Sequence, residues 1–346
     1  MAIRRGWILG SFGWDAALIL FPGLLAAAVV WLAPEGSVPS VWMAFAAIIF
    51  IDTGHQYVTL WRTIFRRQER TSHPIYWVTP FLILLGMTAW FWLRLPYAWA
   101  FVVYVTVYHH IRQYYGMLRW YERLNGRRRV ASESFLYALS VLPFVLLHVR
   151  PLPAMGMRGL YTDQDLFLAP HPGLYRIGLV IYGAVVAAWL LYELALWRRG
   201  VREINRSLAV LAPAVVQGGC FLLGRSLATI VVPLLIAHGI PYLAIISLSL
   251  TRVDPRGFRT LAKAAAVVLA SVVVFGLMEW VYEERWLVIS NAYVHAPIAW
   301  LQGVLLAVYL VPPLSHYVFD AHIWTGKHRE AKLVYALPGA RDPIRA

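Results

Sequence analysis

The chain has 346 residues, of which 60% are hydrophobic and only 14% are charged, and its mean hydropathy is +0.61. Because soluble domains carry about 25% charged residues, this composition excludes an ordinary soluble domain and predicts an all-α protein that crosses a membrane several times. The net charge of +14 is distributed as short basic clusters between apolar runs, a pattern that argues against a nucleic-acid partner.

A helix that crosses a bilayer needs about 20 mostly apolar residues. About ten stretches of the sequence fit this requirement and predict one integral membrane domain over residues 1–346. They are 14–33, 40–61, 75–94, 97–118, 134–149, 174–197, 206–223, 226–249, 260–280 and 295–318. The N-terminal stretch lacks a clear small-residue cleavage site, so we expect it to be retained as the first helix. Prolines inside several runs are expected to bend these helices rather than end them.

Lysine and arginine fix the expected orientation. With the N-terminus in the cytoplasm, 25 of the 31 Lys and Arg residues fall in cytoplasmic segments and only six fall outside. The cytoplasmic segments are 1–8, 62–73, 112–133, 198–206, 252–263 and 322–346. This asymmetry follows the positive-inside rule and predicts ten helices with both termini in the cytoplasm. We therefore expect a multi-pass protein of the inner (cytoplasmic) membrane, with its basic segments beside anionic lipid headgroups.

Five histidines lie inside these apolar runs or at their ends, where ionisable groups are rare and usually functional. They are His55, His109, His110, His238 and His316, and His322 follows just beyond. Asp52 precedes His55 by three residues and Asp320 follows His316 by four, so each pair shares one helix face. Histidine and carboxylate together form a ligand set for iron, zinc or manganese. Cys220 is the single cysteine, which excludes a disulfide or a cysteine-based metal site within one chain.

The predicted topology brings most of these residues to one depth. Helices 40–61, 97–118 and 295–318 all run from outside to inside, which places their polar residues near the cytoplasmic face. We therefore expect His55, His109 or His110, His316 and both aspartates to converge. His109 and His110 are about 100° apart on a helix, so they should not face one centre in the same way. Gln113, four residues after His109, is a candidate partner for a ligand.

Simpler interpretations exist for single residues. A membrane histidine such as His238 is often a hydrogen-bonding link between helices. The two aspartates could be ion-pair partners of Arg62 or Arg112, and the tyrosines near the histidines could belong to the interfacial aromatic belt. For His238, the neighbouring Gly239 and Pro241 favour an opened helix around a cavity, so we predict that it binds metal or supports a ligand.

The segments DTGH (52–55), HHIRQ (109–113) and HYVFDAH (316–322) resemble the histidine-rich motifs of the integral-membrane fatty-acid desaturase and hydroxylase superfamily. That resemblance implies a non-haem iron centre that oxidises lipids with O₂. This chain lacks the HxxxH and HxxHH boxes that are usual in the superfamily, and it has more predicted helices than the superfamily's members usually have. No individual ligand role is therefore carried over. The metal ligands predicted from the residues themselves are His55, His109, His110, His238, His316, Asp320 and His322.

The function predicted from these observations is O₂-dependent oxidation of a hydrophobic small molecule at the cytoplasmic side of the bilayer. One or two iron ions would serve as cofactor, with zinc or manganese as alternatives, and an electron-donor protein would be a partner. Asp52 and Asp320 are the expected catalytic carboxylates. Metal-dependent hydrolysis is a variant of this enzyme. Other classes remain open: a haem-binding electron carrier that uses His55, His110, His238 and His316, a metal- or proton-coupled transporter, and a structural subunit of a membrane complex.

Overall fold

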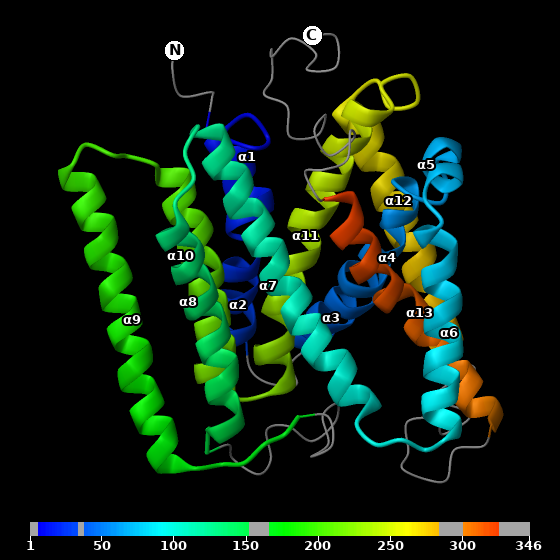
Figure 1. The fold of residues 1–346 in the computed structure, drawn as a ribbon, viewed down its shortest axis with the longest axis horizontal. Helices are drawn as coiled ribbons and strands as arrows, with labels where there is room; N and C mark the ends of the chain where they lie inside the picture. Colours follow the sequence, from blue (N-terminus) through cyan, green and yellow to red (C-terminus); the bar gives the residue numbers. More distant parts are fainter. Residues whose placement is uncertain (1–5, 34–37, 152–165, 284–299, 325–346) are drawn as a thin grey trace. The chain divides into compact units, whose positions relative to one another are not determined.

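The structure is a computed structural model that describes residues 6–33, 38–151, 166–283 and 300–324. Within these residues all regular secondary structure is helical, which confirms the predicted all-α class (Figure 1). The α-helices are α1 (Phe12–Asp15), α2 (Pro22–Leu32), α3 (Val38–Ala46), α4 (Gly54–Val58), α5 (Arg67–Ser72), α6 (Ile75–Trp92), α7 (Ala98–Leu124), α8 (Val130–Val149), α9 (Pro172–Arg198), α10 (Ile204–Gly218), α11 (Leu227–Val253), α12 (Leu261–Tyr282) and α13 (Trp300–Ile323). Three π-helical segments, η2 (Ala16–Leu20), η3 (Ala47–Thr53) and η5 (Gly219–Leu223), and one 3₁₀ turn, η4 (Thr59–Trp61), complete the set.

Seven helices of the described chain are long and apolar enough to cross a membrane, and a bent pair formed by Phe12–Leu20 and Pro22–Leu32 raises the number to eight if it is one span. The protein therefore has the helices of a multi-pass membrane protein. Helical segments also occur at the other two predicted spans. Residues 40–61 are divided among short α, π and 3₁₀ segments, and α7 carries too many polar residues to pass the same test. Ten crossings and cytoplasmic termini stay predictions, and both chain ends lie outside the described residues.

The chain divides into two compact units. The first is drawn from Met1–Ala44 and Trp99–Pro241, and the second from Phe45–Ala98 and Tyr242–Ala346. The chain passes from one unit to the other inside α3, at the start of α7 and inside α11. The prediction of a single membrane domain stays a prediction, and each unit is described by itself below.

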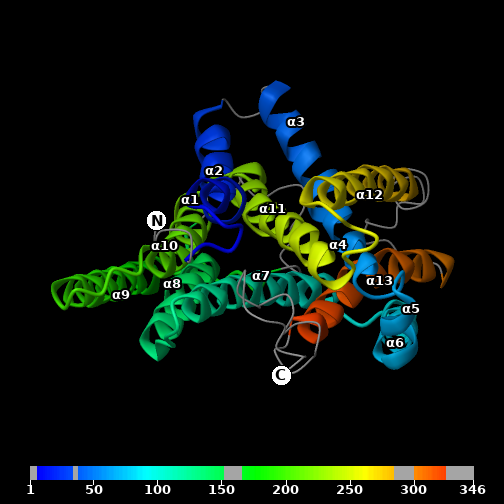
Figure 2. The ribbon, with the colours of Figure 1, turned by 90° about the horizontal axis from the view of Figure 1, so that it is seen from above.

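In the first unit, α8 packs against both α9 and α10, while α10 also packs against α2 and η2. Helix α9 lies at the edge of this group in both views (Figures 1 and 2). Its apolar side chains, including Val180 and Leu191, are largely exposed, as expected for a helix that faces lipid. Close backbone approach holds α2 to α11, because a Cβ at Gly23 would lie only 2.4 Å from the Cβ of Ala237.

Proline shapes α11 in a specific way. Pro233 has no N–H group, so the carbonyl of Thr229, four residues earlier, loses its usual helical donor. The indole Nε1 of Trp31 donates to that carbonyl at 3.2 Å. Helix α11 continues through Pro233 and Pro241, as predicted, and at Pro233 another helix satisfies the backbone group that proline leaves exposed.

The second unit is built on two helix contacts. Helices α6 and α13 lie side by side along much of their length (Figures 1 and 2). Helix α12 packs against η3 and α4, where glycine allows very close approach: a Cβ at Gly54 would lie 2.8 Å from the carbonyl oxygen of Val272. The buried core beside this contact consists of apolar residues of α4, α11 and α12, including Val58, Ile246 and Val268. This packing fixes the segment that carries His55.

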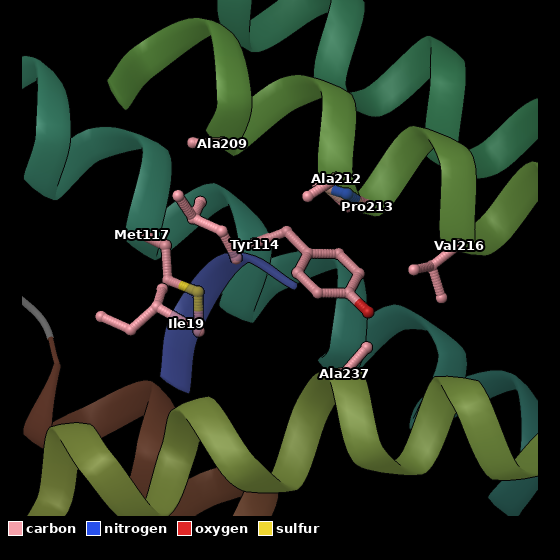
Figure 3. A pocket seen from close by; sticks show the side chains of 9 residues that line it. Ile19, Tyr114, Met117, Ala209, Ala212, Pro213, Val216 and Ala237 are labelled. Atoms are coloured by element: carbon pink, nitrogen blue, oxygen red, sulfur yellow. The ribbon is translucent and has the colours of Figure 1, made fainter. Parts of the chain in front are cut away.

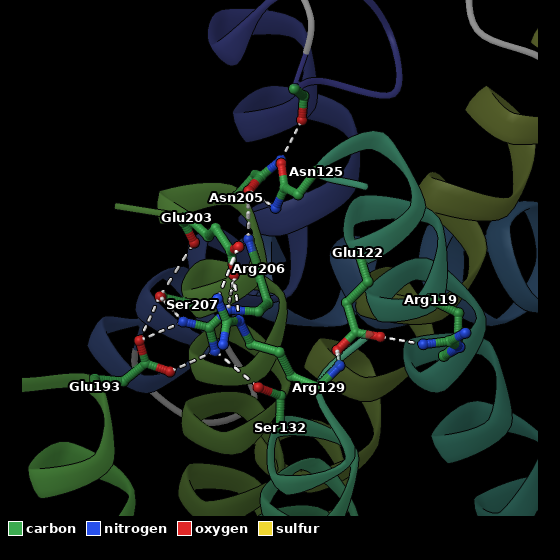
Figure 4. Close-up of polar contacts among 11 residues, drawn as sticks. Arg119, Glu122, Asn125, Arg129, Ser132, Glu193, Glu203, Asn205, Arg206 and Ser207 are labelled. Carbon is green, nitrogen blue, oxygen red and sulfur yellow. Dashed lines mark hydrogen bonds and ion pairs between the residues drawn. The ribbon is translucent and has the colours of Figure 1, made fainter. Parts of the chain in front are cut away.

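A charge network joins α7, α8, α9 and α10 in the first unit (Figure 4). Its four arginines and four glutamates are Arg119, Arg128, Arg129, Arg206, Glu122, Glu133, Glu193 and Glu203. Arg206 is fully buried and donates to Glu193 at 2.7 Å and to Glu203 at 3.0 Å. Burial raises the pKa of the Glu203 carboxyl, but the hydrogen bonds and charges of Arg129 and Arg206 outweigh it and leave that pKa below its usual value.

Candidate metal centre

The second unit contains two buried histidines and a buried aspartate close together. His55 lies on α4, and His316 and Asp320 lie one turn apart on α13, all three almost inaccessible to solvent. The imidazole rings of His55 and His316 have centroids 4.9 Å apart and meet edge to face. The Nε2 atom of His316 lies 3.7 Å from Oδ2 of Asp320. The predicted sharing of one helix face by His316 and Asp320 is therefore confirmed.

Both histidines have their Nδ1 atoms engaged. Nδ1 of His55 lies 2.7 Å from the carbonyl oxygen of Ile51, to which it can only donate. Nδ1 of His316 lies 2.6 Å from Oγ1 of Thr59. A histidine that binds a metal through one nitrogen generally uses the other in a hydrogen bond that fixes its orientation. In His316 the other ring nitrogen, Nε2, is the one that faces Asp320.

Asp320 is held in a similar manner. The hydroxyl of Tyr242 donates to its Oδ1 at 2.7 Å, while Oδ2 is the oxygen that faces His316. Two atoms that each lie about 2.1 Å from one ion are about 3.0 Å apart at a right angle and about 3.6 Å apart at 120°. The separation of 3.7 Å between Nε2 and Oδ2 thus needs little adjustment to accept an ion.

Arg62 is the cation of this region. Its side chain is buried, its charge acts on Asp320, and its guanidinium lies over the ring of Trp324 at 5.5 Å from the centroid. The sequence left open an electrostatic link between Arg62 and the aspartates, and the structure supports this link for Asp320.

The predicted role of Asp52 at the metal site stays a prediction. Its charge acts on Glu279, a buried residue of α12 that accepts a hydrogen bond from the hydroxyl of Tyr57. The main chain of Asp52 also takes part in a hydrogen bond with His55, beside that of Ile51. Glu279 was not among the predicted site residues. Its signal in the sequence is a single acid within the apolar run of α12.

The first unit holds a separate set of three buried histidines, His109 and His110 on α7 and His238 on α11. The ring of His110 stacks on that of His238 with centroids 4.1 Å apart, and the ring of His109 meets it at 4.8 Å. Both neighbouring histidines therefore contact one partner although they point in different directions from α7. The side-chain amide of Gln113 donates to the backbone carbonyl of His238 at 2.8 Å and so links the same two helices.

The predicted convergence of these histidines stays a prediction. His109 and His110 belong to the first unit, whereas His55 and His316 belong to the second. His322 lies apart from the other residues of α13 in the set. Its ring meets those of His73 and Tyr76, at 4.9 and 5.5 Å between centroids. It follows Asp320 by two positions, a spacing that turns side chains to different sides of a helix.

A small cavity of about 20 Å³ lies in the first unit among η2, α7, α10 and α11. Its lining is apolar apart from the phenol of Tyr114, which projects between Ala212, Val216 and Ala237 (Figure 3). Ala237 directly precedes His238 in the chain. The cavity has room for about one water-sized molecule, so it is too small to hold an organic substrate as it stands.

Comparisons of the chain with protein-family models, with curated proteins and with solved structures find no match.

Proposed function

We propose that the protein is a membrane-embedded, metal-dependent oxidoreductase whose ion is held by His55, His316 and Asp320. The observation that carries this proposal is the chemistry of the donor set: two buried imidazoles whose rings lie 4.9 Å apart, and one carboxylate oxygen 3.7 Å from Nε2 of His316. Two histidines and one carboxylate on one side of an ion are the ligands of non-haem Fe(II) oxygenases, which leave positions open for O₂ and substrate.

Iron fits this set better than magnesium or calcium, which prefer oxygen ligands. When bound there, iron would supply O₂ activation, with electrons from a donor protein at the cytoplasmic side. The residues of the chain hold the ligands in place and keep water out, because apolar core residues of α4, α11 and α12 lie beside them. A substrate that is soluble in the bilayer is therefore the substrate class proposed.

The three histidines of the first unit are proposed as ligands of a second ion. The rings of His109 and His110 both contact the ring of His238, and imidazole is the commonest side-chain ligand of transition metals. His322 would bind metal only apart from both sets, with His73.

Metal analysis of the purified protein tests the proposal most directly. We expect at least one equivalent of iron per chain, and an EPR signal when nitric oxide, an analogue of O₂, is added to the reduced protein under anaerobic conditions. Asp320→Asn should abolish that signal. His171→Ala, which changes an exposed histidine at the start of α9, is the control and should retain it. A Soret band would instead identify a haem carrier, and metal-free protein with O₂-dependent activity would refute the proposal.

The proposed cytoplasmic side of the site has its own test. Reporter fusions at residue 160 and at the C-terminus should report opposite sides of the membrane, because the Lys and Arg asymmetry places the segment around 160 outside. Reporters on the same side would contradict this orientation without affecting the metal-binding proposal.

A further inference from the structure

We infer that Arg150 and Arg225 form a binding site for the phosphate group of a membrane phospholipid. Arg150 directly follows α8, and Arg225 lies in the short link between η5 and α11. Both residues belong to the first unit, in which the end of α8 and the start of α11 lie at the same end (Figure 1). Neither residue belongs to the proposed metal centres, so this site is independent of the proposed function.

Backbone carbonyls hold the side chain of Arg150 in a fixed position. The residue is only 9% exposed, and its Nη1 atom donates to the carbonyl oxygen of Phe221 at 3.1 Å and to that of Gly224 at 2.7 Å. These two hydrogen bonds use both protons of Nη1 and fix the plane of the guanidinium. The donors of Nε and Nη2 find no acceptor among the described residues. They are therefore oriented and left for a ligand.

Arg225 brings a second positive charge to the same place. Its peptide bond contains the Gly224 carbonyl that accepts from Arg150, and its charge acts on the Arg150 side chain. Among the described residues, neither arginine pairs with a carboxylate. Every arginine of the charge network, by contrast, lies beside a glutamate. Two neighbouring cations without an acid repel each other, and an anion bound by both removes this cost.

Membrane topology does not account for the pair. Only six of the 31 Lys and Arg residues fall in segments that are predicted to lie outside, and Arg150 and Arg225 are two of these six. The positive-inside rule gives no reason for cations on that side. The fold nevertheless brings together two of them that are far apart in the sequence. A ligand at this place is a reason that orientation in the membrane does not supply.

The surroundings select a phospholipid. Both arginines stand at the ends of apolar helical runs, which is the depth of the lipid headgroups. Leu223, two positions before Arg225, is 64% exposed and offers apolar surface to an acyl chain. The phenol of Tyr175, whose hydroxyl donates to the carbonyl oxygen of Leu222 at 3.3 Å, also acts on Arg150. Guanidinium groups bind phosphate oxygens through paired N–H bonds.

The charge of the site also selects the headgroup. Two arginines without an acid favour a lipid with a net negative charge, such as phosphatidylglycerol. In phosphatidylcholine the positive choline group compensates the phosphate. We therefore expect phosphatidylglycerol to bind more tightly than phosphatidylcholine.

Native mass spectrometry of the full-length protein in detergent, with added phosphatidylglycerol, tests the inference. The side chain of Arg225 makes no hydrogen bond to the described residues, so replacing it leaves the packing intact. Arg225→Ala should weaken lipid binding about fivefold, the usual contribution of one arginine beside an anionic lipid surface, and Arg225→Glu should weaken it further. Arg176→Ala, which changes an exposed arginine near the start of α9, is the matched control and should bind as the wild type does.

The same titration distinguishes a lipid from a free anion. An excess of inorganic phosphate should leave the lipid bound, because free phosphate has no acyl chain to hold it. Displacement of the lipid by phosphate would assign the site to a free anion and overturn the lipid assignment. Equal binding of phosphatidylglycerol and phosphatidylcholine, or equal lipid binding by Arg225→Glu and Arg176→Ala, would refute the site. Should Arg150→Gln fail to fold because it loses its carbonyl contacts, the Arg225 variants still decide.

Discussion

In the first unit every carboxylate of the charge network (Figure 4) lies within 3.1 Å of an arginine. In the second unit Asp320 instead accepts from a tyrosine and faces a histidine 3.7 Å away. Both groups are buried and both join several helices. Close pairing of acids with arginines neutralises the charge network within itself. The second group instead directs a carboxylate oxygen and an imidazole nitrogen toward each other.

The difference separates two reasons for burying ionisable residues in a membrane protein. Four arginines and four glutamates that neutralise one another complete the contacts between helices and need no further ligand. A set of imidazoles and a carboxylate, each oriented through its other polar atom, is the arrangement that a metal ion completes. Removing residues from the two groups should therefore affect different properties of the protein.

The largest expected effect is the loss of metal from His316→Ala. Removing one of three ligands should reduce affinity for the ion by more than about 100-fold, beyond the range for residues that only orient a ligand. Elemental analysis after purification measures this loss, and circular dichroism checks that the helices remain. Arg206→Ala is the comparison from the charge network and should retain its metal. Equal metal loss in the two variants would remove the distinction between the groups.

Stability should respond in the opposite way. Arg206 is buried beside two carboxylates, and breaking such a pair by removing one partner costs about 3–5 kcal/mol of unfolding free energy. Arg128 pairs with Glu133 but is well exposed, so solvent screens the pair and Arg128→Ala should cost far less than Arg206→Ala. Denaturation of both variants in the same detergent measures the two costs. Similar losses would show that burial does not decide the strength of this network.

Close packing of the second unit gives an intermediate effect. A Cβ at Gly54 would meet the backbone oxygen of Val272 at 2.8 Å, and overpacking of this kind costs about 1–3 kcal/mol. We expect Gly54→Ala to lower the unfolding temperature and to weaken metal binding, because it displaces the helix turn that carries His55. Gly116→Ala, at an open position of α7, should instead be neutral or gain up to about 1 kcal/mol. A stable Gly54→Ala protein would contradict the contact between α4 and α12.

Much of the fold is predictable from the sequence because membrane helices have a strong signal of length and hydropathy. The predicted runs 174–197 and 260–280 correspond to α9 (Pro172–Arg198) and α12 (Leu261–Tyr282) within two residues at each end. Hydropathy does not reveal how a run is divided. Residues 40–61 contain a π-helical segment and a 3₁₀ turn, and these depend on side-chain contacts with α12 rather than on composition.

The candidate site was predictable in its residue types more than in its pairings. The spacing of His316 and Asp320 gave their proximity correctly, because it depends on one helix only. The same argument pairs Asp52 with His55, and this pairing stays a prediction; the spacing gave no sign of Glu279 on another helix, on which the charge of Asp52 acts. Thr59 and Tyr242 carried no signal of their own, since hydroxyl residues are common in membrane helices and their role arises only from contacts between α11, α13 and η4.

The smallest expected effect concerns acid. The pKa of Glu203 lies below its usual value in the folded protein because Arg129 and Arg206 outweigh the effect of burial. A carboxyl with a lowered folded pKa contributes stability above its unfolded pKa of about 4.3, and this contribution is lost as the pH falls through the folded value. We therefore expect the unfolding temperature of the wild type to fall below about pH 4.3, and that of Glu203→Gln to fall less over the same range. Scanning both proteins from pH 7 to pH 3 in one detergent measures the difference. Parallel curves would mean that Glu203 titrates alike in the folded and unfolded chains, and that pairing in the charge network leaves its proton equilibrium unchanged.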